Sequence, residues 1–172
     1  MSKLSQDAFF EIFGQELFHS DSGRPFFSDS FDVSVSHKDS ITEMKIVLGP
    51  FRIGIDVESL TPGIAAEKFI GSVIGKKEIA YLKKYQKEKK LSLEAAVAIF
   101  WSLKEAFFKC LDCDLVPGKI SVLKIGKRGK VDLELSQDVV VFMKKRKIEL
   151  CSVTLEIEEG YAYAEVIMEV LV

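Results

Sequence analysis

Hydrophobic and polar residues follow two different periods along the chain, and the changes between them predict three regions. In the first region, apolar residues at helical spacing predict an amphipathic helix within residues 5–18. Alternation of apolar and polar residues then predicts a half-buried strand that starts at Phe31 and leads into Ser36 and His37. Two more strands are predicted here, residues 44–48 and 51–57, with a turn at Gly49 and Pro50 between them.

The middle of the chain is predicted to be helical and the end to be strand-rich. Residues 64–74 and the lysine-rich residues 76–90 are two candidate helices, and residues 92–111 form a long third that Ser92 can cap. The predicted strands after Pro117 are residues 119–125, 131–135, 139–144, 148–157 and 161–170, with turns at 126–129 and 158–160. Strands, then helices, then antiparallel strands favour an α+β domain over a doubly wound sheet.

Length and composition narrow the class of protein. The chain has 172 residues, enough for one domain or two small half-domains, and its net charge is −2 with 48% hydrophobic residues. Disorder and a polybasic nucleic-acid binder are therefore disfavoured. The longest apolar run, residues 95–101, is too short to span a bilayer. Asp7 and Glu11 lie where a signal peptide would have its apolar segment. We expect a cytoplasmic protein that binds neither nucleic acid nor membrane.

Two carboxylates lie two residues apart on the predicted strand 51–57 and its end. Strand alternation points Asp56 and Glu58 to the same side, opposite to the apolar residues of the strand. Neighbouring carboxylates repel each other unless a cation lies between them, and oxygen ligands suit Mg²⁺. Gly54 leaves room for a ligand or another backbone to approach. Taken alone, such a pair is more often the solvated face of a strand than a metal site.

The long predicted helix carries an acid and two bases close together. Trp101, Glu105 and Lys109 follow one another at intervals of four residues and so form one stripe, with Lys104 beside it. Glu105 could bind a metal while both lysines neutralise phosphate oxygens, as phosphoryl-type transfer requires. The simpler alternative is an ordinary Glu–Lys helix pair, which contributes about 0.2–0.5 kcal/mol.

The motifs taken together resemble a known family. They are, in order, Gly23-Arg24-Pro25, Ser36-His37, Gly54-Ile55-Asp56-Val57-Glu58 and Trp101-Ser102-Leu103-Lys104-Glu105-Ala106-Phe107-Phe108-Lys109. This order resembles the 4′-phosphopantetheinyl transferase superfamily, whose signature is formed by the last two motifs. Further along, Glu159-Gly160-Tyr161 is similar to the closing hairpin of the family's domain. The resemblance implies an α+β fold in which an antiparallel sheet packs against a long helix.

The resemblance also implies a reaction. Members move the phosphopantetheine arm of coenzyme A onto a serine of an acyl or peptidyl carrier protein and release adenosine 3′,5′-bisphosphate. By this resemblance Asp56, Glu58 and Glu105 would hold Mg²⁺ against the pyrophosphate. Glu105 and Lys109 would be the catalytic residues, with Glu105, or a metal-bound water that it orients, as the base for the serine hydroxyl.

Further residues are assigned to coenzyme A by the same resemblance. Lys104 and Lys109 are expected near the phosphates and the pantetheine arm. Ser36 and His37 are expected to contact the phosphates of the adenosine end, and Arg24 and Pro25 to line the adenine pocket. The position of Arg24 is usually a lysine in the family. Glu78 matches a further acid that many members carry, without a secure role.

The length of the chain departs from both known forms of the family. Larger members have two similar halves with the site between them, and compact holo-acyl-carrier-protein synthases are single halves whose sites lie between subunits. We expect a single domain over residues 1–172, with a shortened N-terminal part, 1–50, and a core half, 51–172. Before Arg24 this part offers only Lys3 as a lysine or arginine. Either Arg24 and His37 hold the 3′-phosphate, or a second subunit contributes in a homo-oligomer.

Two alternatives stay open. Residues 76–90 carry seven lysines and two glutamates, a net charge of +5, which fits either a dock for an acidic carrier protein or a solvated helix face. The whole chain could also be a non-catalytic module that keeps the fold and binds a carrier protein or a nucleotide. Its shortened N-terminal part favours the module, whereas the clustered acids favour the enzyme.

Overall fold

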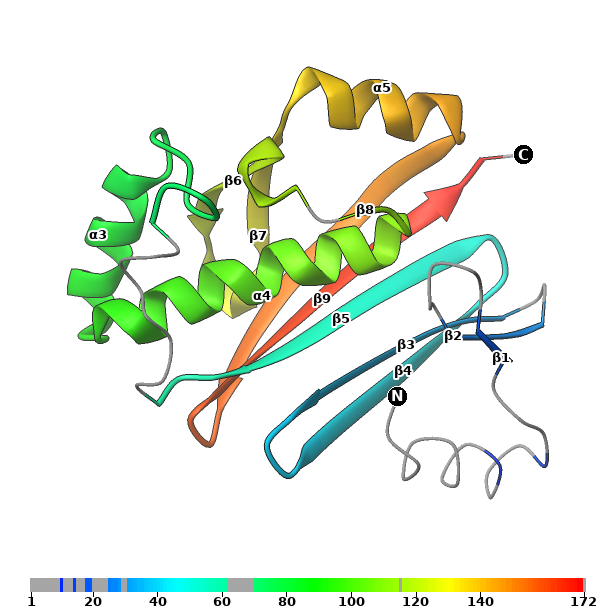
Figure 1. The fold of residues 1–172 in the computed structure, drawn as a ribbon, viewed down its shortest axis with the longest axis horizontal. Helices are drawn as coiled ribbons and strands as arrows, with labels where there is room; N and C mark the ends of the chain where they lie inside the picture. The colour runs from blue at the N-terminus through cyan, green and yellow to red at the C-terminus, as the bar shows by residue number, and fades with distance from the viewer. Residues whose placement is uncertain are drawn as a thin grey trace.

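The computed structural model describes residues 10, 14, 18–19, 25–28, 31–61, 70–114 and 116–171 (Figure 1). The described strands form three sheets, with the orders β1-β2-β3-β4, β5-β9-β8 and β6-β7. The first sheet comprises β1 (Phe18–His19), β2 (Pro25–Ser28), β3 (Phe31–Lys38) and β4 (Ile41–Leu48). The second, which we call the core sheet, comprises β5 (Phe51–Ser59), β8 (Ile148–Glu158) and β9 (Tyr161–Val170). All the strand pairs are antiparallel.

Helices and short strands connect β5 to β8. They are α3 (Ile79–Lys89), α4 (Leu93–Leu111), a 3₁₀ turn η1 (Pro117–Lys119), β6 (Ile120–Ile125), a second 3₁₀ turn η2 (Lys127–Gly129), β7 (Val131–Leu135) and α5 (Gln137–Lys145). The expected α+β fold, an antiparallel sheet packed against a long helix, is confirmed. No helix in the described part of the chain combines the length and apolar character that crossing a bilayer requires.

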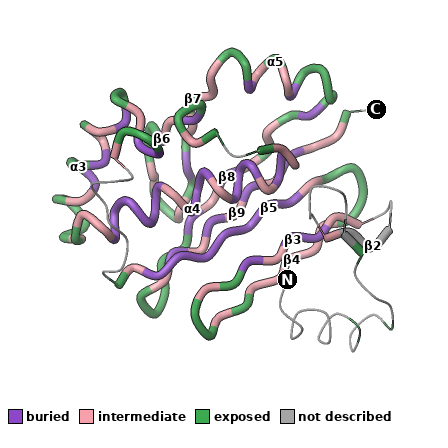
Figure 2. Tube along the Cα trace, in the orientation of Figure 1, coloured by how far each residue is buried: buried purple, intermediate pink, exposed green. Residues whose placement is uncertain are grey.

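The long helix α4 lies across the core sheet and forms the centre of the hydrophobic core (Figures 1 and 2). Ser92 caps its start as predicted, because the Ser92 hydroxyl accepts a hydrogen bond from the Ala95 N–H at 3.1 Å. Phe100, Leu103 and Phe107 of α4 are fully buried in the cluster that the core sheet completes. Burial of this helix face therefore fixes the position of α4 relative to β5.

Gly54 is where β5 and α4 come closest. A Cβ atom on Gly54 would lie 2.0 Å from the Ala106 carbonyl oxygen and 2.4 Å from the Cys110 backbone nitrogen. The expectation that Gly54 lets another backbone approach is thus confirmed, and that backbone is the helix. Because Asp56 and Glu58 lie two and four residues after Gly54 and so on the same side of the strand, this close packing brings the carboxylates of β5 next to α4.

The other edge of β5 is covered by side chains of β3 rather than by a backbone ladder. On β3, Asp32, Ser34 and Ser36 point to this edge at every second position. Each accepts a hydrogen bond from a backbone N–H of β5. Asp32 accepts from Ile53 at 2.6 Å, Ser34 from Ile55 at 3.0 Å and Ser36 from Val57 at 3.1 Å. We call this row of contacts the β3–β5 seam, and it joins the N-terminal sheet to the core.

The structure corrects two sequence predictions. Residues 139–144, predicted as a strand because of their β-branched valines, belong to helix α5, where Val139 and Met143 are buried one turn apart. The predicted strands 44–48 and 51–57 are confirmed as parts of β4 and β5, which belong to different sheets. In the predicted helix 64–74, residues 70–74 form a turn closed by a bridge between Ile70 and Ile74. The rest of that helix, and nearly all of the predicted helix 5–18, fall outside the described residues.

Candidate functional site

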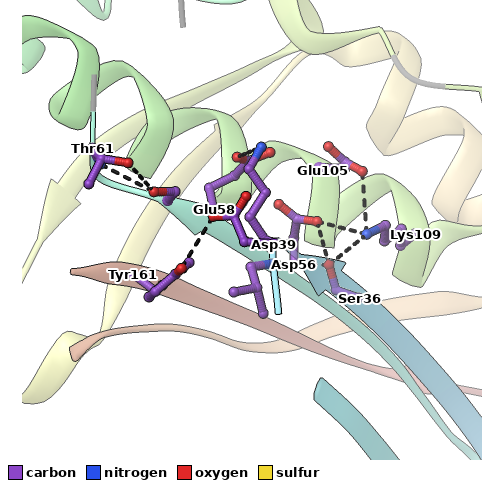
Figure 3. Close-up of polar contacts among 11 residues, drawn as sticks. Ser36, Asp39, Asp56, Glu58, Thr61, Glu105, Lys109 and Tyr161 are labelled. Atoms are coloured by element: carbon purple, nitrogen blue, oxygen red, sulfur yellow. Dashed lines mark hydrogen bonds and ion pairs between the residues drawn. The ribbon is translucent and has the colours of Figure 1, made fainter. Parts of the chain in front are cut away.

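Three carboxylates from two elements meet beside the β3–β5 seam. Asp56 and Glu58 project from β5 and Glu105 projects from α4, and each offers an oxygen atom within 4.8 Å of the other two (Figure 3). The Asp56 side chain is 4% exposed, that of Glu58 12% and that of Glu105 29%. Carboxylates this close repel one another in the absence of a cation. Positive charge nearby is therefore needed to hold them together.

Asp56 has one satisfied and one unsatisfied oxygen. Its Oδ1 accepts hydrogen bonds from the Ser36 hydroxyl at 3.0 Å and from Lys109 Nζ at 2.7 Å. Its Oδ2 is buried and has no hydrogen-bond partner among the described residues. Burial raises the pKa of Asp56 to about 7, against the opposing effect of Lys109 and with a further contribution from Glu105. A divalent cation at Oδ2 would supply the interaction that this buried oxygen lacks.

Two lysines supply positive charge to the three acids. Lys109 Nζ lies 2.7 Å from Asp56 and 3.3 Å from Glu105, and Lys38 Nζ lies 2.7 Å from Glu58. Burial alone would lower the pKa of Lys109, but the two carboxylates outweigh it and raise that pKa. The hydrogen bond that Lys38 donates to Glu58 raises the pKa of Lys38. Sequence patterns did not predict Lys38, because it belongs to none of the motifs. The one signal in the sequence that could have identified it is its position directly after Ser36 and His37.

Two cavities that share lining residues flank the carboxylates. One, of about 340 Å³, is lined by Pro25, Val35, Ser36, His37, Lys38, Asp56, Val57, Glu58, Glu105 and Lys109. The other, of about 710 Å³, shares Pro25, Val35, Glu105 and Lys109 with it and extends to Trp101, Phe108, Phe142 and Arg146. The three carboxylates therefore lie at the wall of a cleft that these two cavities form.

The structure places most of the expected site residues around this cleft. Pro25 and the exposed His37 line it, as do both catalytic candidates, Glu105 and Lys109. Ser36 lines it as well, but its hydroxyl is already engaged by three neighbouring groups of the site. Arg24 lies outside the described residues.

Lys104 is not brought into the cleft. Its side chain is fully buried, and Lys104 Nζ lies 2.6 Å from both Glu78 Oε2 and the Val73 carbonyl oxygen. Burial lowers the pKa of Lys104, and Glu78 partly opposes this. Lys104 precedes Glu105 by one residue, a rotation of about 100° around the helix, which turns it towards the core. The contact with phosphates expected of Lys104 is therefore replaced by a structural ion pair.

Glu78 completes this buried ion pair instead of joining the three acids. Its Oε1 accepts a hydrogen bond from the Val122 N–H at 2.8 Å, and its Oε2 accepts one from the Gly75 N–H at 3.1 Å. Together with Lys104 it ties the residues before α3 to α4 and to β6. The further acid seen in the sequence thus has a role in the fold.

We expect metal binding to stabilise the protein more at about pH 8 than at about pH 6. Without metal, the pKa of Asp56 is about 7 in the folded chain and about 4 in the unfolded chain. The folded chain therefore holds this proton more tightly, and the contribution of Asp56 to the stability of the fold falls as pH rises between these two values. At about pH 6 a cation must therefore displace a proton. The measurement is the rise in Tm on adding Mn²⁺ after EDTA treatment, at both pH values. An equal or larger rise at about pH 6 would contradict this expectation, and Asp56→Asn is expected to remove the difference.

Comparison with known proteins identifies the fold and the family. The family model ACPS, described as the 4′-phosphopantetheinyl transferase superfamily, matches residues 52–162. A holo-[acyl-carrier-protein] synthase from Neisseria meningitidis is similar in structure, with a TM-score of 0.57 and 20% identity over 69% of this chain and 97% of that chain. No curated protein sequence matches the chain.

Two similar structures hold nucleotides. An ACPS–CoA complex from Chronobacterium ammoniagenes has a TM-score of 0.52 and 19% identity over 71% of this chain and 98% of that chain. An acyl carrier protein synthase from Plasmodium yoelii with ADP bound has a TM-score of 0.51 and 19% identity over 70% of this chain and 97% of that chain. At these identities the structural similarity shows the fold.

The family match has a clear place in this fold. It begins within β5 and ends within β9, so it includes Asp56, Glu58 and Glu105, while the sheet β1-β2-β3-β4 lies before it. The matched segment makes up more than half of the chain. The chain therefore belongs to the 4′-phosphopantetheinyl transferase superfamily.

Proposed function

We propose that this protein is a Mg²⁺-dependent transferase that moves the 4′-phosphopantetheine group of coenzyme A onto a serine of an acyl or peptidyl carrier protein. Adenosine 3′,5′-bisphosphate is the second product. The observation that carries the proposal is the meeting of Asp56, Glu58 and Glu105 within 4.8 Å of one another beside Lys109, in a chain of this superfamily. A cation held there could face a pyrophosphate in the cleft.

The residues present fit a magnesium ion. All three donors are carboxylates, the hard oxygen ligands that Mg²⁺ prefers, and the buried Asp56 Oδ2 has no partner among the described residues. When bound, Mg²⁺ would neutralise charge that develops on the adenosine 3′,5′-bisphosphate leaving group as the pyrophosphate linkage of coenzyme A breaks. Asp56 and Glu58 hold this position from a rigid strand, and Glu105 closes it from the helix.

The side chains around the acids divide the remaining tasks. Glu105 is the most exposed of the three carboxylates and lines both cavities, so it can accept the proton of the incoming serine hydroxyl. Lys109 lies against two carboxylates and can turn to a phosphate oxygen once a cation neutralises them. Pro25 and His37 line the cavity in which we place the adenosine end.

The N-terminal sheet supplies one wall of the cleft from the same chain. Ser36, His37 and Lys38 belong to β3, which lies before the segment that the family model matches. In compact members a neighbouring subunit would complete the site. Here β3 contributes these residues in cis, and we therefore propose that one chain can form the active cleft, so that a homo-oligomer is not needed for it.

A mass-spectrometric assay tests the proposed reaction. The protein is incubated with apo carrier protein and coenzyme A, with Mg²⁺ in one sample and EDTA in the other. The carrier is expected to gain the mass of phosphopantetheine only with Mg²⁺. Binding of the carrier or of coenzyme A without this gain, at any Mg²⁺ concentration, would instead indicate the non-catalytic module.

Glu105→Gln is expected to reduce the transfer rate by more than about 100-fold and to leave the fold intact. The change removes a charged ligand without changing volume, and even outer-shell partners of a metal site typically cost about 10–100-fold. The measurement is kcat/KM together with Tm in EDTA. Glu149→Gln, at an exposed position of β8 that lines neither cavity, is the matched control and is expected to change neither. Unchanged turnover in Glu105→Gln would remove Glu105 from the mechanism.

The exposed lysines of α3 are the proposed dock for an acidic carrier protein. Lys83, Lys84 and Lys87 are all exposed, and one neighbouring acid, Glu88, lies 3.8 Å from Lys84. Reversing these three charges is expected to raise KM for the carrier and leave KM for coenzyme A unchanged. The matched control reverses Lys144, Lys145 and Lys147, which are exposed at the end of α5 and just after it. Equal effects of both triple variants would mean that α3 is an ordinary solvated helix.

A further inference from the structure

Ser36 differs from the other side chains of the β3–β5 seam. Like Ser34, two residues before it, Ser36 is buried and accepts a hydrogen bond from a backbone N–H of β5. Unlike Ser34, it also contacts the side chains of Asp56 and Lys109 (Figure 3). Ser36 therefore joins the N-terminal sheet to the charged groups of the site, and Ser34 provides a built-in comparison.

The three contacts of the Ser36 hydroxyl fix the direction of its proton. They are to the Val57 backbone nitrogen at 3.1 Å, to Lys109 Nζ at 3.3 Å and to Asp56 Oδ1 at 3.0 Å. A hydroxyl has one proton to donate and two lone pairs that accept. The backbone N–H and the lysine ammonium can only donate, so they take the two lone pairs. The Ser36 proton therefore points to Asp56 Oδ1.

This arrangement distinguishes the two oxygens of Asp56. Oδ1 receives the Ser36 proton and a second hydrogen bond from Lys109 at 2.7 Å. Oδ2 receives none from the part of the chain that the structure describes, although it is buried. With Oδ1 held by two donors, the carboxylate cannot rotate without breaking both hydrogen bonds. Oδ2 is the oxygen left over for a cation shared with Glu58 and Glu105.

We propose that Ser36 is a positioning residue for the metal site. Its hydroxyl holds the Asp56 carboxylate by Oδ1 and so presents Oδ2 to the cation. The inference rests on the proposed metal-dependent function, and it gives Ser36 a role through Asp56 rather than by contact with a phosphate of the substrate. Outer-shell hydrogen bonds of this kind typically change metal affinity by about 10–100-fold.

The test compares Ser36→Ala with Ser34→Ala by calorimetric titration with Mn²⁺ alone, which suits the same oxygen ligands as Mg²⁺. Both variants remove one side-chain acceptor for a β5 backbone N–H, so both are expected to lower Tm in EDTA, and Ser36→Ala at least as much as Ser34→Ala because it loses two further contacts. Only Ser36→Ala is expected to weaken Mn²⁺ binding, by about 10–100-fold. Ser36→Cys keeps the shape of the side chain with a weak donor, and it is expected to weaken binding too.

The outcomes separate this inference from the proposed function. Suppose that the unaltered protein binds Mn²⁺ and that Ser36→Ala binds it with the same affinity as Ser34→Ala. The inference is then overturned, because the seam has only a structural role. If Ser36→Ala does not fold, Ser36→Cys decides, and binding as tight as in the unaltered protein overturns the inference. Failure of the unaltered protein to bind Mn²⁺ would contradict the proposed function itself.

Discussion

Gly54→Ala is expected to destabilise the protein by more than about 3 kcal/mol, or to prevent folding. The added Cβ would lie 2.0 Å from the Ala106 carbonyl oxygen and 2.4 Å from the Cys110 nitrogen, both backbone atoms of α4. Backbone cannot rotate away as a side chain can, so α4 and β5 must separate. Because the buried face of α4 is the centre of the hydrophobic core, the separation would expose apolar surface of the helix.

Urea denaturation measures this effect, and Gly118→Ala is the matched control. A Cβ on Gly118 would meet no atom closer than 4.0 Å, so this variant is expected to change the free energy of unfolding by less than about 1 kcal/mol. If Gly54→Ala folds, its carboxylates are also expected to bind Mn²⁺ more weakly, because Glu105 would move away from Asp56. Native stability in Gly54→Ala would show that β5 and α4 are not packed as closely as described.

Lys104→Met is expected to cost about 3–5 kcal/mol of stability without changing kcat/KM for coenzyme A in the molecules that fold. The substitution leaves Glu78 charged and buried without its cation, and breaking such a pair from one side is strongly destabilising. Adding Glu78→Gln to Lys104→Met is expected to restore part of the lost stability. The amide oxygen of glutamine can still accept the hydrogen bond of the Val122 N–H.

The same experiment separates the structural role of Lys104 from the phosphate contact suggested by the motif. A lysine that contacted phosphates would, when replaced, raise KM for coenzyme A and leave the free energy of unfolding nearly unchanged. Lys84→Met is the matched control because Lys84 also pairs with a glutamate, at 3.8 Å, but on the surface. It is expected to change stability by less than about 1 kcal/mol.

Patterns within one element predicted the acidic part of the site. Strand alternation correctly put Asp56 and Glu58 on one side of β5, and helical spacing put Glu105 and Lys109 on one face of α4. These are local rules, and they hold because the period of each element is fixed by its backbone geometry. The family motifs then supplied the expectation that strand and helix meet.

Contacts between elements were harder to predict. Alternation identified β3, but it does not show that Ser34 and Ser36 face β5 and satisfy its backbone N–H groups. The valines of α5 favour a strand locally. The segment is nevertheless a helix, because a helix places Val139 and Met143 on the same buried face. Lys104 resembles a site residue in sequence because it adjoins Glu105, and only the packing of α4 shows that it faces Glu78.

A crystal grown with Mn²⁺ and measured where manganese scatters anomalously offers the most direct test. We expect one anomalous peak in each chain, within bonding distance of oxygens from Asp56, Glu58 and Glu105, and with Lys109 turned from the carboxylates towards the cleft. No peak at saturating Mn²⁺, or a peak bound by other residues, would contradict the proposed metal site and the transferase mechanism that depends on it.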